Sequence, residues 1–266
     1  MKKQLCSVFH RDSAEKAYRL VLSAFLIAGF FAVISSPPVE GAEENLEKLL
    51  SSQEKGWAAG KWKFSILLQK QRLGDMEMEI RETKKGYETD MSTKFTLKNM
   101  EYEITGRSKM DENLGLLWAE RVEKGASKDG EIKIAITAEV KDKMLVITVS
   151  ENGKETERTE IEAPSPLYAG TPALFAMTKL LNLRRPQKLS FSLYNSENRR
   201  IVKTDLDILS DRKLIKVGGR KTEAYSVIAD NGKNKMLFEV DPGNEIVRLR
   251  VPGEELSFER IFQKPE

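Results

Sequence analysis

Residues 164–186 read Pro-Ser-Pro-Leu-Tyr-Ala-Gly-Thr-Pro-Ala-Leu-Phe-Ala-Met-Thr-Lys-Leu-Leu-Asn-Leu-Arg-Arg-Pro. We predict that this stretch holds the one apolar helix of a chain that otherwise shows the patterns of strands and turns. Thr171 is a favourable N-cap residue, and Pro172 suits the first helical position, where its missing N–H costs nothing. The arginines at 184–185 fit the negative end of a helix dipole, and the proline after them prevents the helix from continuing.

One broad face of this predicted helix is apolar. Its members follow i, i+3, i+4 and i+7 spacings and are Leu174, Phe175, Met177, Leu180 and Leu181. Burying five such side chains contributes roughly 7–15 kcal/mol, so the face is too apolar to remain in water. We therefore expect the strands on either side of the helix to cover it.

Alternation of apolar and polar residues dominates both flanks of the helix. In residues 61–68, the side chains of Trp62, Phe64, Ile66 and Leu68 face one way and polar side chains the other. The same pattern returns in residues 76–81, 100–105 and 131–141, and in short segments between 189 and 258. Such segments are typical of strands with one buried and one wet face.

Turn signals separate these strands at short intervals. They lie at residues 74–75, 85–86, 129–130, 152–153, 231–232, 242–243 and 252–253, and each contains a glycine. Pairs such as Asn-Gly favour tight hairpins, so consecutive strands should pair antiparallel. About a dozen to fifteen strands exceed what a flat sheet carries comfortably. We predict a mainly β fold: a curved antiparallel meander sheet, or half-barrel, packed around the central α-helix, with a short N-terminal helix in residues 43–56.

The N-terminal segment, residues 1–42, differs from the rest of the chain. Residues 20–36 are uncharged and apolar and follow a basic segment, which indicates either a signal peptide or an N-terminal membrane anchor. Small residues near 41 favour cleavage, whereas the long basic region favours an anchor. In both cases residues 43–266 form an exported β-rich domain, and any membrane contact runs through residues 20–36 if they are retained.

Several kinds of chemistry are absent from the exported segment. The only cysteine, Cys6, and the only histidine, His10, precede the apolar run. Disulfides, cysteine nucleophiles, histidine triads and histidine metal ligands are therefore excluded there. The sequence indicates no cofactor, no metal and no catalytic residues, since phosphate-binding and dinucleotide motifs are missing. Basic and acidic residues nearly balance, 44 against 41, which argues against a nucleic-acid partner.

The missing disulfides favour a bacterial periplasm, or the outer face of a bacterial membrane, as the compartment. The order of elements also resembles the bacterial periplasmic lipoprotein carriers LolA and LolB, or a related uncharacterised envelope family. That order is an export signal, a short Leu-rich helix at residues 46–50, the strand 61–68, a long meander and a helix at mid-chain. The resemblance is architectural and implies an incomplete barrel around helices, with an apolar cavity able to hold acyl chains.

Three functions are consistent with these patterns. The first is a non-catalytic envelope protein that binds a lipid, a lipoprotein acyl chain or another hydrophobic ligand in the half-barrel. Its candidate ligand-binding residues are Trp62, Phe64, Ile66, Leu174, Phe175, Met177 and Leu181. The second is a structural or protein-interaction module of the cell envelope that docks partners on a strand edge. The third is a carboxylate-based glycan hydrolase, with Asp205 and Asp207 on one strand face as a weak candidate pair.

Overall fold

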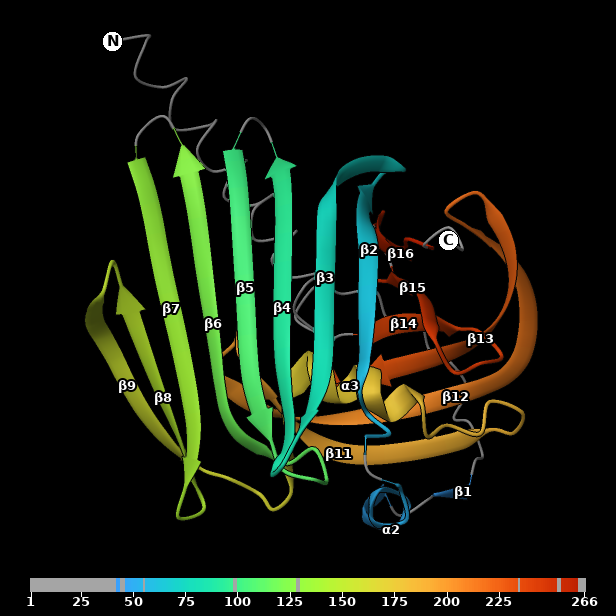
Figure 1. The fold of residues 1–266 in the computed structure, drawn as a ribbon, viewed down its shortest axis with the longest axis horizontal. Helices are drawn as coiled ribbons and strands as arrows, with labels where there is room; N and C mark the ends of the chain where they lie inside the picture. Colours follow the sequence, from blue (N-terminus) through green and yellow to red (C-terminus); the bar gives the residue numbers. More distant parts are fainter. Residues whose placement is uncertain are drawn as a thin grey trace, which may run out of the picture.

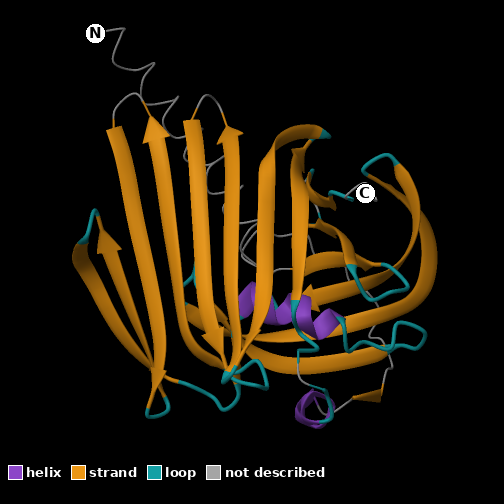
Figure 2. Ribbon diagram, in the orientation of Figure 1, coloured by secondary structure: helices purple, strands orange, loops and turns teal. Residues whose placement is uncertain are grey.

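The fold is mainly β, with one long antiparallel sheet that is not closed into a barrel (Figures 1 and 2). The computed structural model describes residues 42–43, 46–54, 56–97, 100–127, 130–233, 235–252 and 255–262. The predicted signal peptide or anchor lies almost wholly outside these residues. Among the described residues, none of the helices has the length and apolar character needed to span a bilayer.

The first half of the sheet is a meander of long strands. In chain order they are β2 (Gly60–Leu68), β3 (Gln71–Thr83), β4 (Gly86–Leu97), β5 (Met100–Met110), β6 (Leu116–Ser127), β7 (Gly130–Lys141), β8 (Met144–Glu151) and β9 (Lys154–Glu162). Each pairs antiparallel with its neighbours in the chain. This confirms the predicted meander.

The second half continues the same sheet after the helix. Its strands are β11 (Gln187–Asn195), β12 (Arg200–Val217), β13 (Arg220–Asp230), β14 (Lys235–Val240), β15 (Ile246–Arg250) and β16 (Leu256–Arg260). The last strand, β16, pairs antiparallel with β2, so Phe258 lies opposite Ile66. The two halves of the chain are therefore joined at a seam in the middle of the sheet.

The remaining elements are two very short strands beside β11 and two helices. Two strands of two residues each, β1 (Ala42–Glu43) and β10 (Leu167–Tyr168), run parallel to β11. The helices are α2 (Leu46–Ser51) and α3 (Gly170–Thr178). α2 is the short N-terminal helix expected from residues 43–56, although it is confined to fewer residues, and its Leu46 and Leu50 are buried.

The two ends of the sheet approach each other without pairing as strands. Gly115, just before β6, forms an isolated antiparallel bridge with Tyr168 of β10. Arg199, in the β11–β12 hairpin, forms an ion pair with Glu157 of the edge strand β9. In Figure 1, β11 and β12 run across the lower part of the view, crosswise to the upright strands β2 to β7. The sheet is curved, and its apolar side lies on the inside.

The strand pattern predicted from sequence holds for most of the inner face. Trp62, Phe64 and Ile66 of β2 are all buried, and Lys61 and Lys63 between them are exposed. Ile132 is an exception, because its side chain remains 62% exposed on β7 although it belongs to the predicted apolar face. It pairs with Gly125 close to one end of the β6–β7 hairpin, where the core no longer covers the strand.

One predicted turn is wrong. Residues 74–75 lie inside β3, and the β2–β3 hairpin turns at Gln69 and Lys70, both of which have positive φ. A Cβ atom on Gly74 would lie 1.9 Å from the carbonyl oxygen of Lys94 on β4. Gly74 therefore allows β3 and β4 to approach closely, next to a register shift in the β2–β3 pairing, and does not form a turn.

The central helix differs from its prediction at both ends. α3 begins at Gly170, its N-cap residue is Ala169, and no side chain caps it, so Thr171 is not the N-cap. It ends at Thr178, well before the arginines at 184–185. The carbonyls of its last turn accept local hydrogen bonds from the N–H groups of residues 179–181. Asn244 in the β14–β15 loop donates its side-chain amide to the carbonyls of Lys179 and Leu181, just beyond the helix. A contact far away in sequence thus holds the segment that follows α3.

Burial around α3 is also more complete than predicted. Every residue from Ala173 to Thr178 is buried, including those outside the predicted apolar face. Helices that are covered on all sides belong to protein interiors. Leu180 and Leu181 lie beyond the helix, but Leu181 is buried in the same cluster.

Candidate functional site

The seven residues predicted to bind ligand all lie in the main hydrophobic cluster. Each is at most 4% exposed, and the set is Trp62, Phe64, Ile66, Leu174, Phe175, Met177 and Leu181. Phe175 is the point at which strand and helix side chains meet. Its ring contacts those of Trp62, Phe64 and Phe238 edge-to-face, with centroids 5.5, 5.8 and 6.4 Å away.

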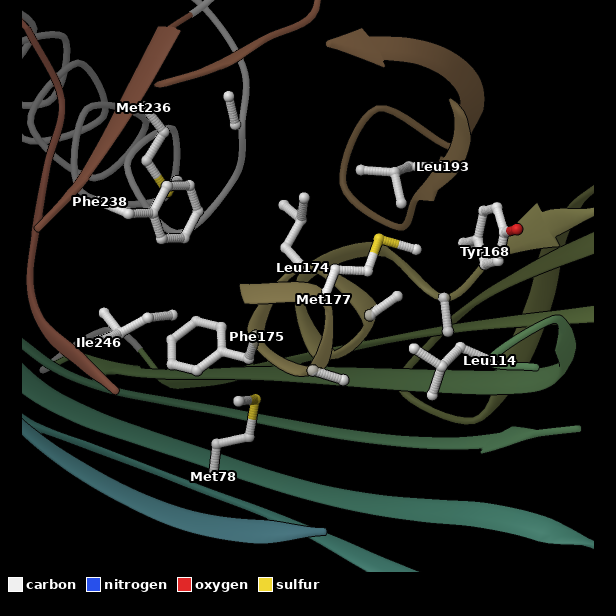
Figure 3. Packing of buried hydrophobic residues seen from close by; sticks show 14 of the residues in the cluster. Met78, Leu114, Tyr168, Leu174, Phe175, Met177, Leu193, Met236, Phe238 and Ile246 are labelled. Carbon is white, nitrogen blue, oxygen red and sulfur yellow. The ribbon is translucent and has the colours of Figure 1, made fainter. Parts of the chain in front are cut away.

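Figure 3 shows how the helix side chains divide within this cluster. Phe175 faces Phe238 and Ile246, whereas Met177 and Leu174 project from other sides of α3. Edge-to-face ring pairs stabilise by about 0.5–1.5 kcal/mol each beyond their burial. Phe175 therefore fixes the position of α3 against strands from both halves of the sheet.

One hollow, which we call the apolar hollow, lies beside Phe175. Its cavity volume is about 20 Å³, and it is partly open to solvent. It is lined by Met76, Met91, Thr171, Phe175, Met236, Leu249, Arg250, Val251 and Phe258. Of the seven predicted residues, only Phe175 lines it; the others form the packed wall behind. Methionine is flexible and polarisable, so such a wall adapts to ligands of different shape.

A second hollow lies at the N-terminal end of α3, and we call it the polar hollow. Its cavity volume is about 80 Å³. Strands β4 to β6 contribute Thr89, Met91, Gly106, Ser108 and Arg121; the helix start contributes Gly170 and Thr171; and β11 contributes Tyr194 and Asn195. Met91 and Thr171 line both hollows. The two hollows therefore adjoin each other along the first turn of α3.

The backbone at this point depends on a glycine. Gly170 has φ +41, and a Cβ atom there would lie 2.7 Å from the carbonyl oxygen of Tyr194. A larger residue at 170 is therefore disfavoured by both conformation and space. This close approach places the first turn of α3 beside Tyr194.

Buried charge surrounds the polar hollow. Arg121 and Glu123 are neighbours on the inner side of β6, and Nε of Arg121 donates to Oε1 of Glu123 at 2.6 Å. Both residues are at least nine-tenths buried. Nη2 of Arg121 and Oη of Tyr194 are buried, and neither has a hydrogen-bond partner among the described residues. A buried polar group without a partner is costly, so such atoms mark sites of function or strain.

Three further ionisable residues, Tyr194, Glu197 and Arg200, lie on the β11–β12 hairpin. Burial, aided by the nearby Glu123, raises the pKa of Glu197 to about 8 against the opposing effects of Arg121 and Arg200. Burial likewise raises the pKa of Tyr194 well above its usual range, against the effect of Arg121 and Arg199. Nε of Arg200 is buried without a partner among the described residues. At neutral pH, Glu197 is therefore mostly protonated and does not neutralise the arginines.

Arg121, Glu123, Tyr194 and Glu197 are not among the residues predicted from sequence. Strand β6 places charges on both faces, since Glu120 and Lys124 alternate with Arg121 and Glu123. This pattern gives no indication of which charges point inward. The other predicted pair, Asp205 and Asp207, lies on one strand face, and Asp205 is held by Ser190 and Lys188. No set of three His, Cys, Asp or Glu side chains suited to a metal ion occurs in the described part of the chain.

Comparisons with known proteins give one distant likeness. No protein-family model matches the chain, and no curated protein matches it. A crystal structure of a DUF1089 family protein (PA1994) from Pseudomonas aeruginosa is similar, with a TM-score of 0.30 and 11% sequence identity. The match covers 67% of this chain and 90% of that one. The predicted resemblance to the LolA and LolB carriers therefore still rests on the order of elements alone.

Proposed function

We propose that this protein is a non-catalytic component of a bacterial envelope that binds a lipid, a lipoprotein acyl chain or another hydrophobic ligand. In this proposal the curved sheet forms a half-barrel around α3, as in the LolA-like plan, and the ligand lies between sheet and helix. The observation that carries it is the apolar hollow beside Phe175, which adjoins the polar hollow at Met91 and Thr171.

The lining of the hollows supports this proposal. Ligand sites commonly combine an apolar wall with a few polar groups. The hollows themselves enclose only about 20 and 80 Å³, so a ligand enters only if flexible side chains such as Met91 move. The apolar hollow has Met76, Met91, Met236 and Phe258 around Phe175, and Arg250 at its border. The polar groups lie in the neighbouring hollow. Both hollows expose mainly apolar surface, so a largely apolar ligand with a small polar group matches them better than a compact polar metabolite does.

A filling substitution tests the proposal. Val251 is half-buried and lines the apolar hollow, so Val251→Trp should occupy part of that space without disturbing the deep core. We expect it to weaken binding of the neutral probe N-phenyl-1-naphthylamine at least about tenfold, which is about 1.4 kcal/mol. Fluorescence titration of the full chain in detergent-free buffer measures the affinity.

The matched control is Leu214→Trp, because Leu214 is 64% exposed on β12 and lines neither hollow. Leu214→Trp should bind the probe as the unaltered protein does. Native mass spectrometry of protein purified from membranes should also reveal a co-purified amphiphile. A folded Val251→Trp variant with unchanged affinity, together with a protein that carries nothing from the membrane, would contradict the proposal.

One observation favours a second candidate, a carboxylate-based glycan hydrolase. Glu197 has a raised pKa and lies close enough to Glu123 for their charges to interact, as in acid–base carboxylate pairs. Against this candidate, neither residue lines the two hollows, and Arg121 already binds Glu123. Release of soluble sugar from purified peptidoglycan that is lost in Glu197→Gln would favour the hydrolase.

The interaction-module hypothesis finds less support. The edge strand β9 exposes a row of charged side chains that includes Glu155, Glu157, Arg158 and Glu160. Charged edges are a common means of preventing strand addition. The opposite edge, β11, is partly covered by β1 and β10.

A further inference from the structure

We propose that the polar hollow receives the anionic head group of an amphiphile whose apolar tail lies in the apolar hollow. This inference rests on the proposed function and narrows it to ligands that carry a carboxylate or a phosphate head. Three independent features of the polar hollow support it: the open start of α3, two unpartnered buried donors, and an excess of positive charge.

The first feature is the N-terminus of α3. No side chain caps this nine-residue helix, and its first turn contains no acidic residue. Gly170, Thr171 and Pro172 all line the hollow. The first N–H groups of a helix have no partner within it, and the helix dipole adds partial positive charge at this end. Pro172 has no N–H, so Gly170 and Thr171 are the residues of this turn whose N–H groups an anion in the hollow would meet.

The second feature is the pair Arg121 and Tyr194. Both residues line the hollow, and each is 3% exposed. Nη2 of Arg121 and Oη of Tyr194 donate to nothing among the described residues, although Nε of Arg121 is held by Glu123. Glu123 thus fixes the guanidinium and leaves one donor nitrogen unused. Guanidinium groups bind carboxylates and phosphates more strongly than neutral donors do.

The third feature is the balance of buried charge. Glu123 offsets Arg121, but Glu197 is mostly neutral at pH 7 because burial raises its pKa. Arg200 therefore lacks an ionised partner in the described structure, and its Nε is buried without a hydrogen bond. Glu123, Glu197 and Arg200 do not line the hollow, whose charged lining residues are Arg107, Glu120 and Arg121. With two basic and one acidic side chain, that lining has an excess of one formal positive charge, which a single anionic head group would neutralise.

Finally, the two hollows adjoin each other, as the head and the tail of one ligand would require. Met91 and Thr171 line both, so a ligand with its head near Arg121 can extend its tail past Met91 toward Phe175. Gly106 lies opposite Met91 on β5, and a Cβ atom there would come within 3.2 Å of the Met91 Cε atom. The Met91 methyl group therefore already fills the space that this glycine leaves, and a tail that extends toward Phe175 must displace it.

A pair of fluorescent probes tests this assignment. cis-Parinaric acid carries a carboxylate, and its methyl ester has the same tail without the charge. We expect the unaltered protein to bind the acid at least about tenfold more tightly than the ester. Tyr194→Phe should reduce affinity for the acid about five- to tenfold and leave the ester unchanged, because it removes one hydroxyl and leaves no group unpaired.

Control variants separate this effect from a general loss of structure. Thr204→Val removes another buried hydroxyl without a partner, which lies on β12 outside the hollow, and should change neither affinity. The double variant Arg121→Gln/Glu123→Gln removes both charges together, so that no buried charge is left alone, and should abolish the preference for the acid. Inorganic phosphate should compete at least about 100-fold more weakly than the acid, since it has no tail to bury.

The outcomes distinguish the two proposals. Equal binding of acid and ester, unaffected by Tyr194→Phe, would overturn the head-group assignment and leave hydrophobic binding intact. Binding of neither probe would count against the proposed function itself. Displacement of the acid by phosphate at equal concentration would overturn the amphiphile class in favour of a small-anion site.

Discussion

The buried residues are of two kinds: apolar side chains that stabilise the packing of α3, and polar side chains whose buried groups lack hydrogen bonds or have shifted pKa values. Phe175 holds α3 against strands from both halves of the sheet, whereas Arg121 and Tyr194 keep donors unused at the cost of burial. Buried donors without partners are uncommon in folded proteins and occur at functional or strained sites. Glu197 belongs to the same group, since its environment favours the protonated form at neutral pH.

Glu197 predicts an unusual dependence of stability on pH. Its pKa is about 8 in the folded protein and near its ordinary value of 4.5 in the unfolded chain. Folding therefore binds a proton between these values, and the contribution of Glu197 to stability falls as pH rises from about 4.5 to 8. Glu197→Gln should flatten this dependence and raise the melting temperature at pH 9 by at least about 2–4 °C, which is about 1 kcal/mol.

Thermal unfolding of both proteins at pH 5 and pH 9 measures the effect. Arg121 and Glu123 on β6, and Tyr194 and Arg200 on the β11–β12 hairpin, act on Glu197 or lie beside it. Glu157→Gln is the control, because it removes an exposed carboxylate at the same end of the sheet. A parallel rise of both variants at both pH values would contradict the assignment.

At the scale of elements, alternation in the sequence is sufficient to predict the strands but not their exact connections. Trp62, Phe64 and Ile66 point inward as expected because one buried face fixes the register of a strand. The start of α3 could not be predicted in the same way. Gly170 and Ala169 define it through contact with Tyr194, a residue of a later strand. The polar hollow likewise depends on pairing between distant strands, which no local pattern shows.

Gly74 provides a test at this scale. Gly74→Ala places a methyl group against the backbone of Lys94, so the strands β3 and β4 must separate locally. We expect a loss of about 1–3 kcal/mol in the free energy of unfolding, measured by urea denaturation. Gly125→Ala on β6 is the matched control, because its Cβ would make only ordinary contact with Tyr102. Gly125→Ala should be neutral or slightly stabilising, and equal losses in both variants would contradict the role assigned to Gly74.

At the scale of the molecule, the sheet is a continuous curve whose centre is the seam between β16 and β2. Loss of β16, the last strand in the chain, would therefore open the middle of the sheet. The predicted fold class is confirmed at the level of a mainly β, open antiparallel sheet. The pairing of β2 with β16 was not predicted, because pairing between two strands far apart in sequence leaves no local signal in either one.

Removal of residues 255–266 tests the importance of the seam. This deletion removes β16 and exposes the edges of both β2 and β15, together with Phe64 and Ile66. We expect loss of cooperative unfolding and aggregation at micromolar concentration, detected by circular dichroism and light scattering. Deletion of residues 263–266 alone, which leaves β16 whole, is the control. A soluble, cooperatively folded protein without β16 would contradict this expectation.

The same seam also sets an order in time. β2 begins at Gly60 and is made early, but its partner β16 begins only at Leu256. At synthesis rates of about 5–20 residues per second, the interval between them is on the order of 10–40 s. During that interval the inner face that contains Trp62 and Phe64 has no complete cover. Until β16 has been synthesised, this apolar face must therefore be covered by something other than β16. It is most exposed to water while the chain is still being made.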